Sequence, residues 1–120
     1  MIDKVIVLHP DLPPSARTEE GGQRTHVRQP HVALEEAMGL ARAIDLEIAH
    51  AEVVTVKQIR PATLIGGGVV ERIAEMAKEQ EIGLVYVDAA ISPVQQRNLE
   101  KELNCKVIDR TGLILEIFGA

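Results

Sequence analysis

The sequence predicts an α/β fold, a small open parallel sheet of about four strands flanked by helices. Short apolar runs such as Val5-Ile6-Val7-Leu8 and Leu84-Val85-Tyr86-Val87 are typical of strands that are buried on both faces. Segments with apolar residues at helical spacing lie between these runs, and such alternation indicates parallel strands joined by right-handed crossovers. We expect the strand order 2-1-3-4, with functional residues beyond the carboxyl ends of the strands.

The first part of the chain contains a strand, a long loop and a helix. The strand is expected over residues 2–8. Residues 9–31 contain four prolines and the pair Gly21-Gly22, which oppose regular structure. Loops longer than ~15 residues are usually functional or flexible. A helix is expected over about 32–45, where apolar residues recur at helical spacing.

The middle of the chain predicts a second strand–helix unit. The strand covers Glu47–Val56 and is followed by a basic loop, Lys57–Pro61. A glycine turn then opens a helix over about 68–80. The third strand, Leu84–Val87, ends at Asp88.

The last part of the chain begins with a clear helix start. Ser92 and Gln95 form a capping box, with a proline at the first helical position, and the helix is expected to run to about Leu103. A short fourth strand is expected over 106–108. The apolar tail 113–118 fits either a helix capped by Thr111 or an edge strand. Its abrupt end predicts a truncated C-terminal segment and a longer parent protein.

The composition argues against several classes of function. The formal net charge is −5, so any contact with RNA must come from a local patch or from parts of a longer parent protein. Aromatic residues are only 2% of the chain, which argues against a base-stacking platform. The single cysteine, Cys105, is consistent with a reducing cytosol. No membrane span and no signal peptide are recognisable, so we expect a cytoplasmic protein.

The glycine turn is a candidate phosphate-binding loop. Gly66, Gly67 and Gly68 would let backbone amides approach an anion at a helix N-terminus. The turn lacks the lysine and the hydroxyl of G-x-x-x-x-G-K-[ST], and Glu71 stands where G-x-G-x-x-G requires a glycine. A tight turn into a helix is therefore favoured, and binding of ATP or GTP at this loop is the alternative.

Asp88 is the candidate acidic residue beside that loop. At the end of a strand it could help to bind a nucleotide through Mg²⁺ or act as a base. No histidine or second carboxylate lies close to it in sequence, and no nucleophile–base pair accompanies it. The four histidines have no zinc-site spacing. We therefore expect no catalytic residue and no metal site in this chain.

Polar residues of the third helix form a candidate binding surface. Arg97 and Lys101 are one turn apart and share a face next to Asn98. Cations and amides together suit contacts with phosphate and sugar oxygens. A solvated helix surface looks the same, and Glu100 and Glu102 dilute the charge, so both interpretations stay open.

Two segments, SPVQQRNLE at 92–100 and KVIDRTGLILEIF at 106–118, closely resemble the end of the N-terminal domain of HflX proteins, a family of GTPases. The run RPATLIGGG at 60–68 is similar to the glycine-turn region of that family. The resemblance is continuous from about residue 47 to 118, whereas residues 1–46 match only in outline.

The resemblance implies a cytoplasmic GTP-binding protein that associates with the large (50S) ribosomal subunit, including its rRNA, and splits or rescues ribosomes. It implies that residues 1–112 form an α/β binding and regulatory domain, and that 113–120 begin the connection to a helical segment and a G domain. GTP and Mg²⁺ would bind in that G domain, so this chain alone should not hydrolyse GTP. The family's N-terminal portion has also been credited with adenine-nucleotide binding, which makes ATP a candidate ligand.

The resemblance also assigns candidate site residues. Relatives often carry a lysine in a G-x-G-K pattern where this chain has Val69, so a phosphate contact from that lysine is absent here. The residues that match the family pattern, and that are expected to face a ligand, rRNA or the parent's other domains, are Arg97, Asn98, Asp109, Arg110 and Thr111, with Lys101 beside them.

Overall fold

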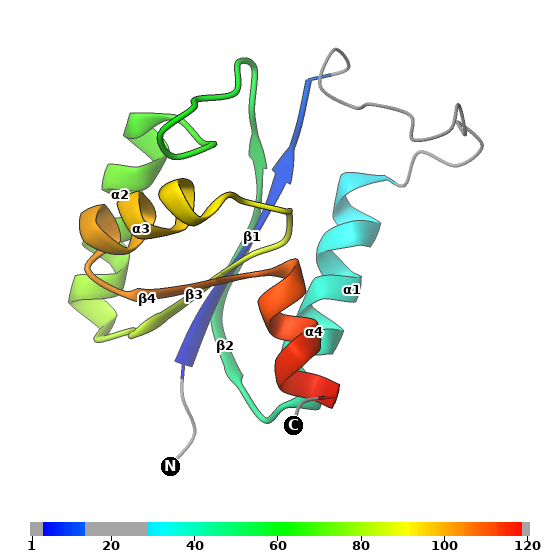
Figure 1. The fold of residues 1–120 in the computed structure, drawn as a ribbon. Coiled ribbons are helices and arrows are strands. Elements are labelled where there is room, and N and C mark those ends of the chain that lie inside the picture. The colour runs from blue at the N-terminus through cyan, green and yellow to red at the C-terminus, as the bar shows by residue number, and fades with distance from the viewer. Residues whose placement is uncertain (1–3, 14–28, 119–120) are drawn as a thin grey trace.

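Four parallel strands form the central sheet in the order β2-β1-β3-β4, as the sequence predicts (Figure 1). The computed structural model describes residues 4–13 and 29–118 of the chain. The strands are β1 (Lys4–Asp11), β2 (Glu47–Thr55), β3 (Leu84–Val87) and β4 (Lys106–Asp109).

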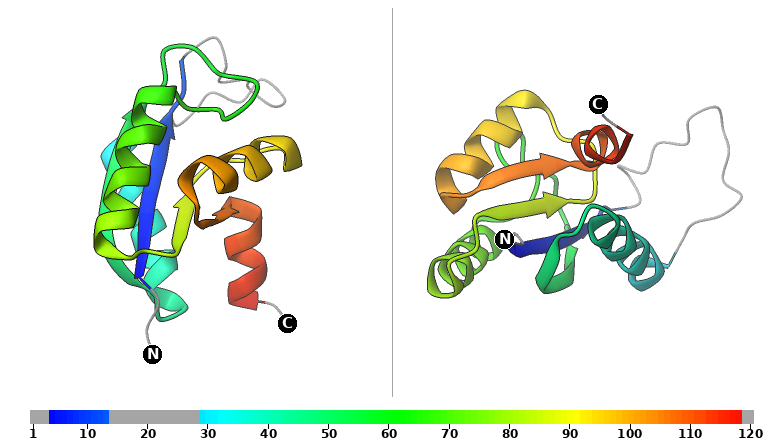
Figure 2. Two further views of the ribbon diagram at one scale, coloured as in Figure 1. Left: turned by 90° about the vertical axis from the view of Figure 1, so that its left-hand side faces the viewer. Right: turned by 90° about the horizontal axis from the view of Figure 1, so that it is seen from below.

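Helices cover both faces of this sheet (Figure 2). Helices α2 (Gly67–Gln80) and α3 (Pro93–Leu103) pack on one face, and α1 (Pro30–Ala43) and α4 (Arg110–Phe118) pack on the other. Side chains of a strand alternate between its two faces, so Ile6 and Leu8 belong to the first core and Val5 and Val7 to the second. The predicted α/β class is confirmed.

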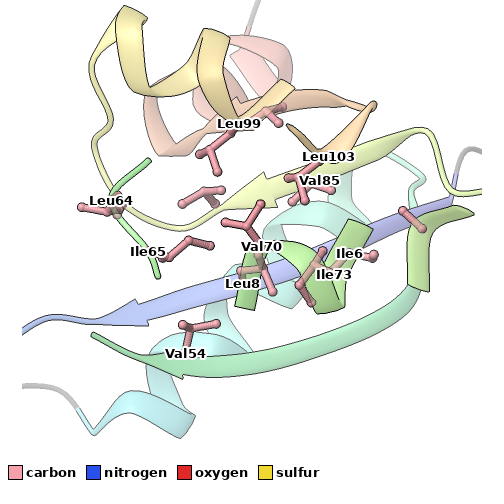
Figure 3. Packing of buried hydrophobic residues seen from close by; sticks show 14 of the residues in the cluster. Ile6, Leu8, Val54, Leu64, Ile65, Val70, Ile73, Val85, Leu99 and Leu103 are labelled. Carbon is pink, nitrogen blue, oxygen red and sulfur yellow. The ribbon is translucent and has the colours of Figure 1, made fainter. Parts of the chain in front are cut away.

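The two cores are almost entirely aliphatic. Figure 3 shows the larger one, in which Val70 and Ile73 of α2 and Leu99 and Leu103 of α3 meet the sheet. In the smaller core the buried residues of α1 are alanines, which let the helix lie close to the strands. Tyr86 is the one aromatic residue of that core among the described residues.

β1 is longer than the sequence predicts, because it continues through residues that we assigned to the loop 9–31. Pro10 pairs with Val54 of β2, while the pairing of β1 with β3 ends at Leu8. Beyond Leu8 no described strand pairs with β1 on the side of β3, so Pro10, which has no N–H group, is tolerated there. At the other end of the segment, Pro30 is the first residue of α1. The rest of the expected flexible loop, residues 14–28, lies outside the described residues.

The apolar tail forms a helix, which decides between the two alternatives. The cap is Asp109, whose Oδ1 accepts a hydrogen bond from the backbone N–H of Gly112 at 2.9 Å. The expected cap, Thr111, lies within the first turn instead, so that expectation was wrong. Leu113 is fully buried, and the expected domain boundary after residue 112 falls inside α4. No described helix is long and apolar enough to cross a membrane.

Candidate functional site

The carboxyl edge of the sheet carries a cluster of four polar side chains around Asp88. This carboxylate follows β3 directly and is 6% exposed. It accepts hydrogen bonds from His9 Nδ1 at 2.9 Å, Tyr86 Oη at 2.8 Å and Arg110 Nε at 3.2 Å. Arg110 Nη2 also donates to the backbone oxygen of Asp88 at 3.0 Å. We call these four residues the Asp88 cluster.

The Asp88 cluster is electrostatically balanced. Burial acts to raise the pKa of Asp88, but the hydrogen bonds from His9 and Tyr86 and the charge of Arg110 together hold that pKa below its usual range. Burial and the neighbouring Asp88 carboxylate raise the pKa of the Tyr86 phenol. A Mg²⁺ ion at this carboxylate would have to displace Arg110. Among the described residues no group of three or more metal-ligating side chains exists.

The glycine turn does not need its glycines for backbone conformation. Gly66 precedes α2, and the two glycines after it begin the helix. A Cβ atom on any of the three would meet nothing within 4 Å. The left-handed residue is Leu64 instead, with a φ of 72°. The turn thus exposes amides of the first turn of α2, which no side chain caps.

The space beside the glycine turn is acidic. An open pocket of about 540 Å³ lies between α2 and α3, with Glu71, Glu75 and Glu102 in its lining. Its one cation, Arg72, is held by Glu52 through two hydrogen bonds of 2.8 and 2.6 Å. These carboxylates would repel a nucleotide triphosphate, so the pocket does not strengthen the case for a phosphate site.

The third helix presents two cations to solvent. Arg97 and Lys101 are both exposed, and neither has an ion-pair partner among the described residues. Val94, which is 53% exposed, shares their face at helical spacing. Glu100 does not dilute this charge from the same face, because its Oε2 accepts a hydrogen bond from the backbone N–H of Val107.

Asn98 makes a contact within the fold that the sequence did not predict. Its Nδ2 donates to the backbone oxygen of Ala62 at 3.0 Å. Gln95, one turn earlier, donates from Nε2 to the backbone oxygen of Arg60 at 3.4 Å. The amides of α3 therefore hold the loop that follows β2, and the sequence could not show this because the loop is more than thirty residues away.

The remaining candidate residues belong to α4 and its cap. Asp109 caps the helix, Arg110 belongs to the Asp88 cluster, and Thr111 is exposed. Helix α4, which these residues cap or begin, packs on the face of the sheet opposite α3, so the candidates belong to two separate groups. Of the Asp88 cluster, sequence reasoning missed His9, although the predicted strand order places the ends of β1 and β3 side by side.

Comparisons with known proteins agree with this architecture. A family described as GTP-binding GTPase N-terminal matches residues 31–119. The GTPase HflX of Magnetococcus marinus is 47% identical over 87 residues, which are 72% of this chain and 20% of that protein. The GTPase HflX of Escherichia coli is 48% identical over 63 residues, which are 52% of this chain and 15% of that protein.

A solved structure supports the fold over nearly the whole chain. A GTP-binding protein from the archaeon Sulfolobus solfataricus, in complex with GDP, superposes with a TM-score of 0.67 at 17% identity. The match covers 98% of this chain and 30% of the archaeal one. The chain thus spans a fifth or less of the two curated relatives and under a third of that structure. It belongs to the family of GTP-binding GTPase N-terminal domains, as a domain of the HflX type.

Proposed function

We propose that this chain is the binding and regulatory module of a cytoplasmic HflX-type GTPase that docks on the large ribosomal subunit and splits or rescues ribosomes. GTP, Mg²⁺ and hydrolysis then belong to a G domain, joined through a helical segment, in the part of such proteins that this chain does not cover. The proposal rests on family membership and on the outward cations of α3.

The proposed docking surface is supported by a difference in ion pairing among the arginines. Arg72 and Arg110 are neutralised by Glu52 and Asp88. Arg97 lacks such a partner among the described residues, although the chain as a whole carries a net charge of −5. Unpaired cations on an acidic protein suit a partner rich in phosphate, such as rRNA.

Co-sedimentation of the chain with 50S subunits tests this proposal. Replacing both Arg97 and Lys101 by glutamate should reduce the bound fraction about ten-fold or more at low salt. The matched control reverses the same number of charges at Lys4 and Arg42, which are exposed and lie away from α3. Equal binding of the α3 variant and the unaltered chain would exclude this surface.

A second candidate function is nucleotide binding at the start of α2. The uncapped amides of that helix and the exposed Gly67 and Gly68 support it. Calorimetric titration with Mg-ATP and Mg-GTP tests it, and Gly67→Pro is the informative variant. Proline at the first helical position keeps the helix but removes one N–H donor, so it should weaken a true phosphate contact. No heat at millimolar nucleotide would exclude this function.

A further inference from the structure

We infer that the basic loop, Lys57–Pro61, forms one continuous surface with the outer face of α3, and that this surface binds the backbone of duplex RNA without reading its bases. Gln95 and Asn98 act as positioning residues that hold the two halves together. The inference rests on the proposed function and assigns the residues and the mode of binding.

The contacts between loop and helix carry the inference. Gln95 donates to the oxygen of Arg60, and Asn98 donates to the oxygen of Ala62. Both amides come from the α3 face next to Arg97, so their bonds hold the backbone of Arg60 against α3, and the side chain of Arg60 is exposed there. Lys57, three residues earlier, is also exposed.

The basic loop is also fixed from within. Arg60 and Leu64 exchange two backbone hydrogen bonds, of 3.3 and 2.8 Å. The residues Thr63, Leu64 and Ile65 that follow the loop are buried. The Thr63 hydroxyl donates to the backbone oxygen of Ile65 at 2.8 Å. The backbone of Arg60 is therefore ordered before a partner arrives, and binding does not have to supply the free energy of ordering it.

The acidic side chains of α3 lie apart from the cations of this region. Glu102 lines the pocket toward α2, and Glu100 is bonded to the β4 backbone. The loop and α3 thus contribute four exposed cations that have no ion-pair partner among the described residues: Lys57, Arg60, Arg97 and Lys101.

The chemistry of the surface favours an RNA backbone over bases or a protein. Tyr86 is buried and no described aromatic side chain is exposed near these cations, so bases have no ring to stack on. Cations at two separate segments suit two runs of phosphates, as the strands of an A-form duplex present them. An acidic protein partner is the alternative that the experiment below excludes or establishes.

Fluorescence anisotropy of a labelled RNA duplex tests the inference. Replacing Lys57 and Arg60 by alanine should weaken binding about ten-fold and lower the log–log salt slope by about two, one for each cation. Asn98→Ala should weaken binding about three-fold in the unaltered chain and leave it unchanged in the Lys57→Ala/Arg60→Ala background, since its effect passes through the loop. Two duplexes of unrelated sequence should bind equally well.

Asn104→Gly is the matched control, because it removes an exposed asparagine from the left-handed C-cap of the same helix. Equal effects of Asn98→Ala in both backgrounds, or unaltered duplex binding by the loop variant, would overturn the inference and leave the α3 cations standing. Binding to 50S subunits but to no duplex would indicate a ribosomal protein or a non-duplex rRNA element as the partner and overturn it as well. A chain that binds neither would overturn the proposed function itself.

Discussion

The guanidinium of Arg110 donates two hydrogen bonds to Asp88, one to the carboxylate and one to the backbone oxygen. This pair ties the start of α4 to the end of β3. Because His9 of β1 donates to the same carboxylate, one buried side chain fixes the relative positions of three elements. Asp88 is therefore first of all a structural joint at the carboxyl edge of the sheet.

Replacing Asp88 by asparagine should destabilise the fold by about 2–3 kcal/mol, since the variant removes the acceptor of a charged hydrogen bond and places an NH₂ group against donors. Urea denaturation monitored by circular dichroism measures the change. Asp45→Asn is the control: Asp45 is exposed and has a φ of 64°, a conformation that asparagine adopts readily. Equal stabilities of the two variants would contradict the joint.

Tyr86 offers a spectroscopic test of the same cluster, because it is the one tyrosine in the sequence. Burial and the Asp88 charge raise its pKa, so phenolate absorbance should not appear in the folded chain near pH 10, where free tyrosine ionises. A raised pKa favours the protonated phenol in the folded state. Its contribution to stability is therefore present below the ordinary pKa and lost as the pH rises further. Tyr86→Phe should lack this alkaline loss of stability.

Protonation of Glu52 should account for part of the loss of folding stability at acidic pH. Hydrogen bonds from Arg72 lower its pKa to about 2, from an ordinary value of 4.5. The ionised form is favoured in the folded state, so its stabilisation is present above pH 4.5 and is lost as the pH falls toward 2. Glu52→Gln should flatten the dependence of the urea midpoint on pH in this range. Glu47→Gln, at an exposed position of the same strand, should leave the slope unchanged.

The cap of α4 should be measurable on its own. Asp109→Ala removes the acceptor of the Gly112 N–H and should cost about 1 kcal/mol, whereas Asp109→Ser should retain most of the stability. Urea denaturation of the two variants compares them. An equal loss for alanine and serine would show that the carboxylate acts through something other than capping.

The fold was largely predictable because local rules and the global pattern agree. Buried apolar runs indicated the strands, and the capping box of Ser92 and Gln95 is present as expected. The extent of β1 was not predictable from the sequence. Proline usually ends a strand, and only the structure shows that β3 has already ended beside Pro10. The form of the tail was open, because a run of apolar residues fits a buried strand and a buried helix equally well.

The sequence predicted which side chains of the candidate site are exposed, but not which residues they contact. Arg97 and Lys101 face solvent as their helical spacing indicates. Two of the three partners of Asp88, His9 and Arg110, are 79 and 22 residues away, so no local motif reveals them. The amide side chain of Asn98 is of a type that often binds ligands. In the structure it donates a hydrogen bond to the backbone of a loop that only folding brings close to it.

The separation of charge across α3 also bears on how the chain meets a partner. Acidic side chains line the α2 side of this helix, and cations occupy its outer face. An acidic molecule with such a dipole is repelled by a polyanion in most orientations and attracted in one. The encounter is then selective for orientation before any contact forms, and this selectivity should weaken when salt shortens the reach of the field that turns the molecule.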